Sequence, residues 1–301
     1  MQTEVGSYTA PRRVGEGYHW GVALARSRLF VAPDAAAVCV AVVRGGLGGR
    51  RLEGFARVPL APGALLPSPS GSNLLRPEEV RDALRRALDA TGRSSAACTL
   101  LLPDGVGRLA LLPLPADADA REFVRFRLAA SLPFPSGEAI VDVLSAGHGQ
   151  VVGAALRRGA VAEYEQAVVS LGLSVERVHL APLVALGGLL RAASGAGVDV
   201  VLGDAAVCFA ALAGGAIVAL RNRRRDKADG EGDRLLQEAE RVARQAANGH
   251  GNLPRAVALS GADATRLRAE VGGTDDGLPP LASVRQWPEI AEAAWLRGLL
   301  S

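Results

Sequence analysis

The sequence predicts an α/β fold made of two lobes. The chain has 301 residues, which exceeds the usual size of a single hydrophobic core. A group of short apolar runs with the patterns of strands opens the chain, and a similar group appears after residue 195. Helical patterns that alternate with further strands follow each group, which is typical of sheets covered by helices.

The N-terminal part begins with a meander of strands. Four strand-like runs precede the first helix: residues 18–24, 28–32, 36–43 and 52–60. Residues 59–73 are rich in proline, glycine and serine and form a connection. We expect the first helix to begin at Pro77, since proline suits a first turn, and to end at Gly92.

The middle of the chain alternates strands with helices. Strand patterns cover residues 98–102, 108–112, 140–144, 151–156 and 174–180. One helix is capped by Asp117 or Asp119 and runs through Ser131, where a Leu-Pro pair ends it. Two further helices are expected at residues 160–171 and 182–193.

The C-terminal part returns to strands and then helices. Strands are expected at residues 199–202, 207–212, 216–221 and 256–260, and helices at residues 231–247, 263–271 and 288–300. Residues 198–220 approach the length of a membrane-spanning helix. However, Asp199 and Asp204 lie inside this run and glycines interrupt it, so buried strands are the prediction and no membrane span is expected.

Composition and motifs exclude several classes of function. The net charge is +3, which gives no clustered basic face for nucleic acid. The four histidines are scattered without the spacing of metal ligands, and neither a phosphate-binding P-loop nor a Gly-x-Ser-x-Gly elbow occurs. The dense basic run at residues 221–227 suits an anionic lipid or an acidic partner, although a solvated hairpin end is the favoured interpretation.

The order of the elements resembles that of the actin and sugar-kinase superfamily. Within it, residues 98–142 resemble the PilM family of type IV pilus assembly proteins. The resemblance rests on a Leu-Pro-Asp turn at residues 102–104, on a helix that ends in Leu-Pro-Phe at residues 132–134, and on Glu138 and Asp142. Residues 151–185 continue it with an alanine-rich strand, a helix, a Leu-Gly-Leu turn and a further strand and helix.

This resemblance implies an actin-like (ribonuclease H-like) two-lobed fold with an inserted subdomain in the first lobe. The expected division follows from it: a flexible N-terminus at residues 1–16, a first lobe at 17–94 and 160–194, an inserted subdomain at 95–159, and a second lobe at 195–301.

The resemblance also implies a function. The chain would be a cytoplasmic scaffold in the inner-membrane complex of a type IV pilus, peripheral to the membrane and in contact with other pilus assembly proteins. A groove beside the insertion would receive the N-terminal peptide of a PilN-like single-span membrane protein. Residues expected to contact this peptide are Phe123, Phe126, Pro133 and Phe134, for which core packing is the alternative.

ATPases of the superfamily hold MgATP with two hairpins that each carry an aspartate, because magnesium prefers hard oxygen ligands. The first hairpin would read Asp-x-Gly-x-x-x-x-Lys. The run aligned with it, residues 21–28, has neither the aspartate nor the internal glycine, and only Arg26 and Arg28 are left to contact an anion.

The other nucleotide motifs also differ from the superfamily pattern. In the second hairpin Gly203 is kept, but valine stands at the aspartate position and Asp204 follows the glycine. The adenosine motif keeps one glycine of two, in Ser260-Gly261. We therefore expect a degenerate site without catalytic residues, metal or cofactor beyond weak binding of MgATP. The alternatives are an active actin-like ATPase and a scaffold similar to GspL of type II secretion.

Overall fold

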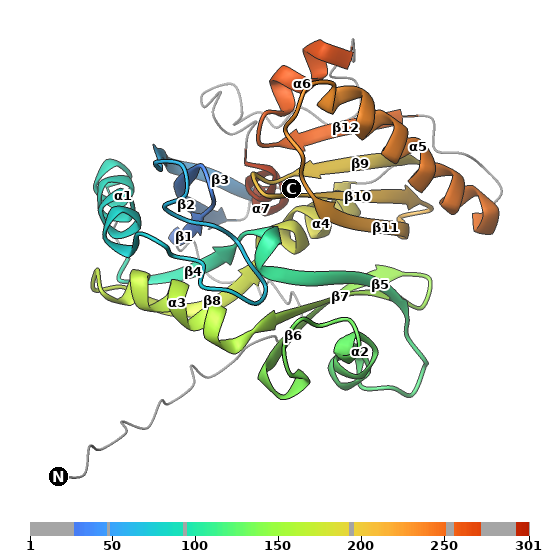
Figure 1. Cartoon of the computed structure of the whole chain (residues 1–301), viewed down its shortest axis with the longest axis horizontal. Helices are drawn as coiled ribbons and strands as arrows, with labels where there is room; N and C mark the ends of the chain where they lie inside the picture. Colours follow the sequence, from blue (N-terminus) through green and yellow to red (C-terminus); the bar gives the residue numbers. More distant parts are fainter. Residues whose placement is uncertain are drawn as a thin grey trace.

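The computed structural model describes residues 27–46, 49–92, 95–192, 196–250, 256–271 and 293–300. It confirms the predicted α/β fold, with three sheets among these residues and helices packed against them (Figure 1). The expected flexible N-terminus at residues 1–16 and the expected strand at residues 18–24 lie outside the described residues.

The sheet of the first lobe has the spatial order β3-β2-β1-β4-β8. Its strands are β1 (Ser27–Pro33), β2 (Ala37–Gly46), β3 (Gly49–Pro59), β4 (Ala97–Leu102) and β8 (Ser174–Leu180). The first three form the predicted antiparallel meander, and β4 and β8 add to it as parallel strands. Because neighbouring side chains of a strand point to opposite faces, Val31 enters one core cluster and Phe30 another.

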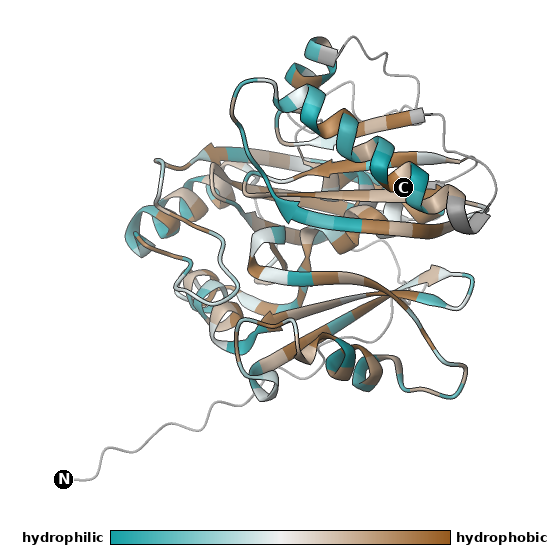
Figure 2. Cartoon of the chain, turned by 45° about the vertical axis from the view of Figure 1, so that its right-hand side comes forward, coloured by the Kyte–Doolittle hydropathy of each residue, from teal (hydrophilic) through white to brown (hydrophobic). Residues whose placement is uncertain are grey.

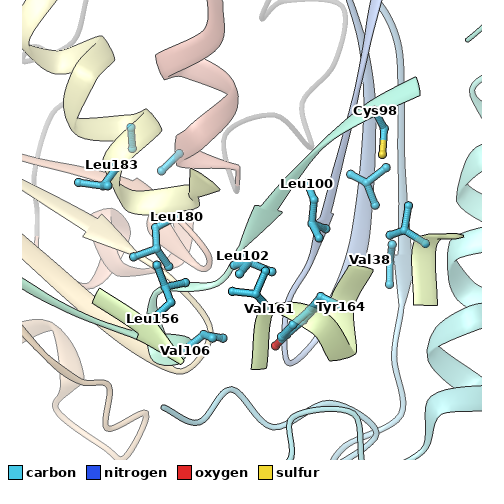
Figure 3. Close-up of a cluster of buried hydrophobic side chains, with 14 of the residues drawn as sticks. Val38, Cys98, Leu100, Leu102, Val106, Leu156, Val161, Tyr164, Leu180 and Leu183 are labelled. Carbon is cyan, nitrogen blue, oxygen red and sulfur yellow. The ribbon is translucent and has the colours of Figure 1, made fainter. Parts of the chain in front are cut away.

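Helices cover both faces of this sheet. They are α1 (Pro77–Ala90), α3 (Arg158–Val169), α4 (Ala181–Ala192) and α7 (Ala294–Leu300). On the face of Val31, α1 and α3 close the main core, to which α3 contributes Val161 and Tyr164 (Figure 3). On the face of Phe30, α4 packs with α7, whose Trp295 is buried. Burial of both faces explains why the central strands are almost wholly apolar.

The second lobe repeats the topology of the first. Its sheet has the order β11-β10-β9-β12, with β9 (Gly197–Leu202), β10 (Ala206–Ala213), β11 (Ala216–Arg224) and β12 (Ala256–Gly261). The meander β9-β10-β11 is antiparallel, and β12 is parallel to β9 as β4 is to β1. One face packs on α5 (Glu231–His250) and α6 (Ala264–Val271), and the other joins the core of the first lobe.

The run at residues 198–220 thus forms strands, as the sequence predicts. It is occupied by β9, β10 and most of β11. Within the part of the chain that the structure describes, none of the helices combines the length and the apolar composition that crossing a membrane requires.

A third, separate sheet has the order β5-β7-β6. Its strands are β5 (Gly107–Pro113), β6 (Ala139–Gly147) and β7 (Gln150–Arg157), and α2 (Ala120–Ala129) covers its outer face. Gly153 of β7 allows this close contact, since a Cβ there would lie 2.5 Å from Val124 of α2. The boundary expected at residue 95 differs from this arrangement. It precedes β4, which pairs inside the first-lobe sheet because its apolar residues fit between β1 and β8.

Candidate functional site

Two hairpin turns, one from each lobe, meet at the ends of the central strands. The turn between β1 and β2 contains Asp34 and Ala36, and the turn between β9 and β10 contains Gly203 and Asp204. The amide of Asp204 donates to Oδ2 of Asp34 over 3.4 Å, and the amide of Ala36 donates to Oδ2 of Asp204 over 3.2 Å. Each aspartate therefore satisfies a backbone donor of the opposite turn, which joins the two lobes by a reciprocal pair of hydrogen bonds.

A third carboxylate, that of Asp104, lies beside this junction. It follows β4 and opens the short helix η1 (Asp104–Val106). Its side chain is buried, and Oδ1 has no hydrogen-bond partner among the described residues. The glycine of the second turn permits this approach, because a Cβ at Gly203 would lie 2.6 Å from Oδ1 of Asp104. Gly203 is thus required for close packing against a carboxylate.

Burial changes the charge of this cluster. Burial, with a smaller contribution from the charge of Asp34, raises the pKa of Asp104 to about 8. Burial, together with the charge of Asp204, raises the pKa of Asp34 to about 7. Desolvation and like charges both disfavour the ionised form of a carboxyl group. Near neutral pH the cluster therefore holds at least one proton.

Replacing Asp104 by asparagine is expected to stabilise the protein most at alkaline pH. The native pKa of about 8 lies above the unfolded value of about 4, so the folded protein loses stability as the pH rises from about 4 to about 8 and Asp104 is ionised above that. Asparagine keeps the shape without ionising. We expect a gain of about 2 kcal/mol near pH 9, equivalent to ~5 °C in Tm, and a smaller gain near pH 5.

Thermal unfolding of both proteins across this pH range measures the effect. Asp89→Asn, which removes a carboxylate from the exposed side of α1, serves as the control and should change stability by less than about 0.5 kcal/mol. A gain from Asp104→Asn that is equal at both pH values would contradict the assignment of a buried, protonated Asp104.

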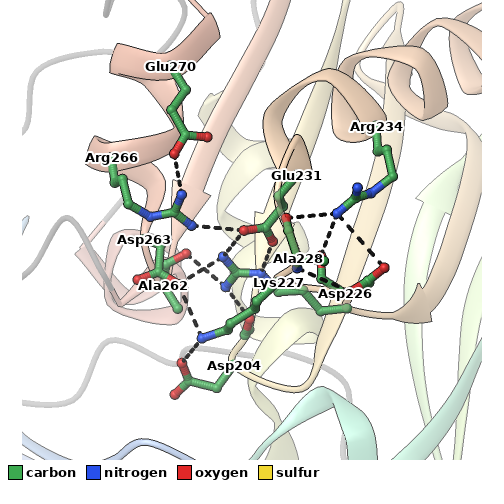
Figure 4. A network of polar contacts seen from close by, with 12 residues as sticks. Asp204, Asp226, Lys227, Ala228, Glu231, Arg234, Ala262, Asp263, Arg266 and Glu270 are labelled. Atoms are coloured by element: carbon green, nitrogen blue, oxygen red, sulfur yellow. Dashed lines mark hydrogen bonds and ion pairs between the residues drawn. The ribbon is translucent and has the colours of Figure 1, made fainter.

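Cationic groups surround the second turn. The guanidinium of Arg225, which directly follows β11, donates to the carbonyl oxygens of Gly203 over 2.8 Å and Ala262 over 3.0 Å. It also pairs with Glu231 over 2.6 Å. Figure 4 shows the surrounding network, in which Nζ of Lys227 lies 3.1 Å from Oδ1 of Asp204. This turn, β12 and α5 are therefore held in one position by buried polar contacts.

Glu231 at the start of α5 is the buried anion of this network. Burial raises the pKa of its carboxyl group, but the hydrogen bonds and charges of Arg225 and Arg266 outweigh that effect and leave the pKa below its usual value. The carboxylate is therefore ionised at neutral pH. A paired charge of this kind costs little as long as both partners are present.

The space left at the junction is small. A cavity of about 60 Å³ lies between the two turns and α7, and Asp34, Asp104 and Trp295 are among the residues that line it. Sites for small molecules usually have about 300–1,000 Å³. The cavity between the two hydrogen-bonded turns is therefore smaller than a usual small-molecule site. Among the described residues, no set of histidine, cysteine, aspartate or glutamate side chains is arranged to hold a metal ion.

The fold that carries this junction is similar to folds of known proteins. Neither a family model nor a curated protein sequence matches the chain. A solved PilM-PilN type IV pilus biogenesis complex is similar in structure, with a TM-score of 0.69, 19% identity, and coverage of 91% of this chain and 97% of the other. A protein from Bacteroides thetaiotaomicron described as having an actin-like ATPase fold matches with a TM-score of 0.51, 10% identity, and coverage of 81% and 86%. The fold is actin-like.

A third solved structure is the cytoplasmic domain of EpsL, an inner membrane component of the type II secretion system of Vibrio cholerae. It matches with a TM-score of 0.49, 12% identity, and coverage of 78% of this chain and 82% of that one. At identities this low, the similarities to the PilM-PilN complex and to the Bacteroides thetaiotaomicron protein establish the actin-like fold and not the activity.

Among the described residues the first hairpin is β1-β2, and its turn lies at residues 34–36 and not at residues 21–28. The turn that meets the second lobe is formed by Asp34 and its neighbours, so the hairpin carries an aspartate after all. Arg28 lies near the start of β1, about 17 Å of extended chain before Pro33. Burial and the charge of Arg177 lower the pKa of Arg28. Arg26 lies outside the described residues.

The structure brings together the other residues that the sequence singled out for the nucleotide site. Gly203 and Asp204 form the second turn, and Ser260 and Gly261 end the neighbouring strand β12. The sequence analysis missed Asp34 as a member of this site. Its signal in the sequence was a Pro-Asp turn between two largely apolar strands.

The residues expected to bind a partner lie apart from this junction. Phe126 projects from α2 with 78% of its surface exposed, whereas Phe123 is half-buried and packs against the core beneath the helix. Pro133 is exposed and Phe134 is half-buried in the segment after α2. The two phenylalanines of α2 thus differ in environment, and Phe126 is the one available for contact.

Proposed function

We propose that the chain is a nucleotide-independent scaffold of a type IV pilus machine. It would act at the cytoplasmic side of the inner membrane by holding the N-terminal peptide of a PilN-like membrane protein beside other pilus assembly proteins. The reciprocal hydrogen bonds between Asp34 and Asp204 carry this proposal, since they close the place where an actin-like ATPase holds phosphates. The similarity to a PilM-PilN complex supports the choice of partner.

Phe126 is the strongest candidate for a contact with the peptide. It is a large apolar side chain exposed on α2, whose other face is anchored to the third sheet through Val124 and Leu128. Aromatic side chains that become buried on binding contribute much of the affinity of protein interfaces. An exposed residue can also be replaced without opening the core.

The test is calorimetric titration of the full chain with a synthetic peptide that copies the cytoplasmic N-terminus of the PilN-like protein encoded beside it. We expect saturable binding with the same Kd in the presence and absence of MgATP. Phe126→Ser should weaken binding by about tenfold or more. Val169→Ser, at an apolar position of α3 that is 54% exposed, is the matched control and should leave Kd unchanged.

The outcomes separate the rival functions. Clear binding of MgATP without binding of the peptide would refute the scaffold and favour an active ATPase. If Phe126→Ser bound the peptide as tightly as the unmodified chain, the scaffold function would stand, but the peptide would bind to a different surface. A point substitution is preferable to deleting residues 95–159, because that deletion would remove β4 from the middle of the first-lobe sheet.

A further inference from the structure

The segment between β11 and α5 contains Lys227, which is the only lysine in the chain. Lysine and arginine together number 34, so every other long basic side chain is an arginine. Figure 2 shows that β11 becomes hydrophilic toward its end, from which this segment continues. Unlike the guanidinium group of arginine, the amine of lysine is readily acylated and then loses its charge. An acyl donor therefore has one basic side chain to modify in this chain.

Lys227 lies at the junction of the two lobes (Figure 4). Its Nζ is 3.1 Å from Oδ1 of Asp204 and 3.2 Å from Oδ2 of Asp263. Asp204 belongs to the second hairpin turn, and Asp263 directly precedes α6. The side chain of Lys227 is 42% exposed, whereas that of Asp204 is 10% exposed. A small reagent in solvent can therefore reach the amine, while the carboxylate that the amine neutralises is largely buried.

Lys227 is the cation that compensates Asp204. In the part of the chain that the structure describes, the ion pair with Lys227 is the only one that Asp204 forms. Arg225 lies nearby, but its guanidinium pairs with Glu231 and Asp263. Loss of one partner from a largely buried ion pair leaves the other charge desolvated and unpaired, which is costly. If Lys227 lost its charge, the carboxylate of Asp204 would therefore be left without a compensating cation.

The carboxylate of Asp204 also joins the two lobes, since its Oδ2 accepts a hydrogen bond from the amide of Ala36. The charge of Lys227 acts on the first lobe as well. Burial and the charge of Asp204 raise the pKa of Asp34 to about 7, and the charge of Lys227 opposes this rise. Asp104 adds a third carboxyl group to the cluster, and repulsion among carboxylates grows when positive charge is removed. The charge of Lys227 thus stabilises the contact between the two turns.

We propose that Lys227 is an acylation site and that its acylation releases the contact between the two hairpin turns. The donor is an acyl phosphate. The nitrogen of Lys227 attacks the carbonyl carbon, so that a C–N bond forms as the C–O bond to phosphate breaks. The two protons that the ammonium group loses leave with the phosphate, and nothing is oxidised or reduced. The resulting amide is neutral and cannot form ion pairs with Asp204 and Asp263. This inference does not depend on whether the chain binds a PilN-like peptide.

The first experiment treats the full chain with acetyl phosphate at neutral pH and maps the products by peptide mass spectrometry. We expect an acetyl group on Lys227, which the peptide masses distinguish from one on the α-amino group. Nα-acetyl-lysine amide in the same solution is the reference for a fully accessible amine. If Lys227 stayed unmodified after this reference had reacted completely, that result would overturn the proposal.

Hydrogen exchange then measures the contact between the turns. The amides of Ala36 and Asp204 donate across the junction. We expect them to exchange about tenfold faster or more in the acetylated chain, because the junction opens more often. Lys227→Gln, which resembles the neutral amide, should give the same increase without treatment. Lys227→Arg keeps the charge and cannot be acetylated at this side chain. Its junction should exchange as in the unmodified chain, both before and after treatment with acetyl phosphate.

Amides inside β7 report on the rest of the fold, because this strand pairs with neighbours on both sides. They should exchange at the same rate in all forms of the chain. Junction amides that exchange equally slowly with and without the acetyl group on Lys227 would refute the role of this lysine. Faster exchange in β7 as well as at the junction would also contradict it, since that result would indicate general unfolding.

Discussion

Replacing Arg225 by methionine is expected to destabilise the protein by about 3–5 kcal/mol. The side chain of Arg225 is 1% exposed, and its guanidinium pairs with Glu231, which is 3% exposed. Methionine would leave that carboxylate with Arg266 as its remaining partner. It would also remove the donors that now reach the carbonyl oxygens of Gly203 and Ala262. Breaking one side of a buried ion pair costs far more than the pair contributes, because the other charge stays desolvated.

Chemical denaturation of Arg225→Met measures this loss. Arg86→Met, at an exposed position of α1, is the matched control and should change stability by less than about 0.5 kcal/mol. Arg225→Lys should fall between the two, since an ammonium group keeps the charge but lacks the planar set of donors. If Arg225→Met were as stable as the control, the network around the second turn would not hold this part of the lobe together.

Replacing Gly261 by alanine is the second large effect that we expect. Gly261 ends β12 with φ at +101°, a conformation that side chains rarely adopt. A Cβ at this position would lie 2.1 Å from the carbonyl oxygen of Leu202 on the paired strand β9. Neither backbone can move without breaking the hydrogen bond from Ala262 to the same oxygen. The conformational strain and the clash together should cost about 3 kcal/mol or more.

The denaturation midpoint of Gly261→Ala tests this expectation. Gly45→Ala is the control, because a Cβ at Gly45 of β2 would meet nothing within 4 Å. A loss from Gly261→Ala that does not exceed that of the control would contradict the close backbone approach. The result also bears on function, since Gly261 belongs to the motif compared with an adenosine site. Its glycine is explained by the contact with Leu202 whether or not a nucleotide binds.

Local sequence patterns did not predict the junction between the two hairpin turns. The sequence comparison aligns residues 21–28 with the first hairpin of the superfamily pattern. The structure instead uses the Pro-Asp turn at Asp34, and Asp204, which contacts it, lies 170 residues further along the chain. The periodicity of neighbouring residues locates each of the two turns, but it does not predict that the turns contact each other. Their contact follows from packing two complete lobes through a shared core.

The exposure of Phe123 and Phe126 was likewise not predictable from the sequence. Their spacing of three residues places both on neighbouring parts of one helix, so the sequence alone could not separate a core residue from an exposed one. The position of α2 over the third sheet determines which of the two phenylalanines is exposed. It buries Val124 and Leu128 and leaves Phe126 in solvent.

Local patterns in the sequence are enough to predict the fold class, the doubled order of strands and helices, and the strands at residues 198–220. These follow from periodicity and from turn residues, which act over a few neighbouring positions. The place of β4 inside the first-lobe sheet and the meeting of three aspartates at the junction become visible only in the folded molecule. Such contacts join residues far apart in the chain, and they form because each lobe must bury its apolar faces against the rest of the molecule.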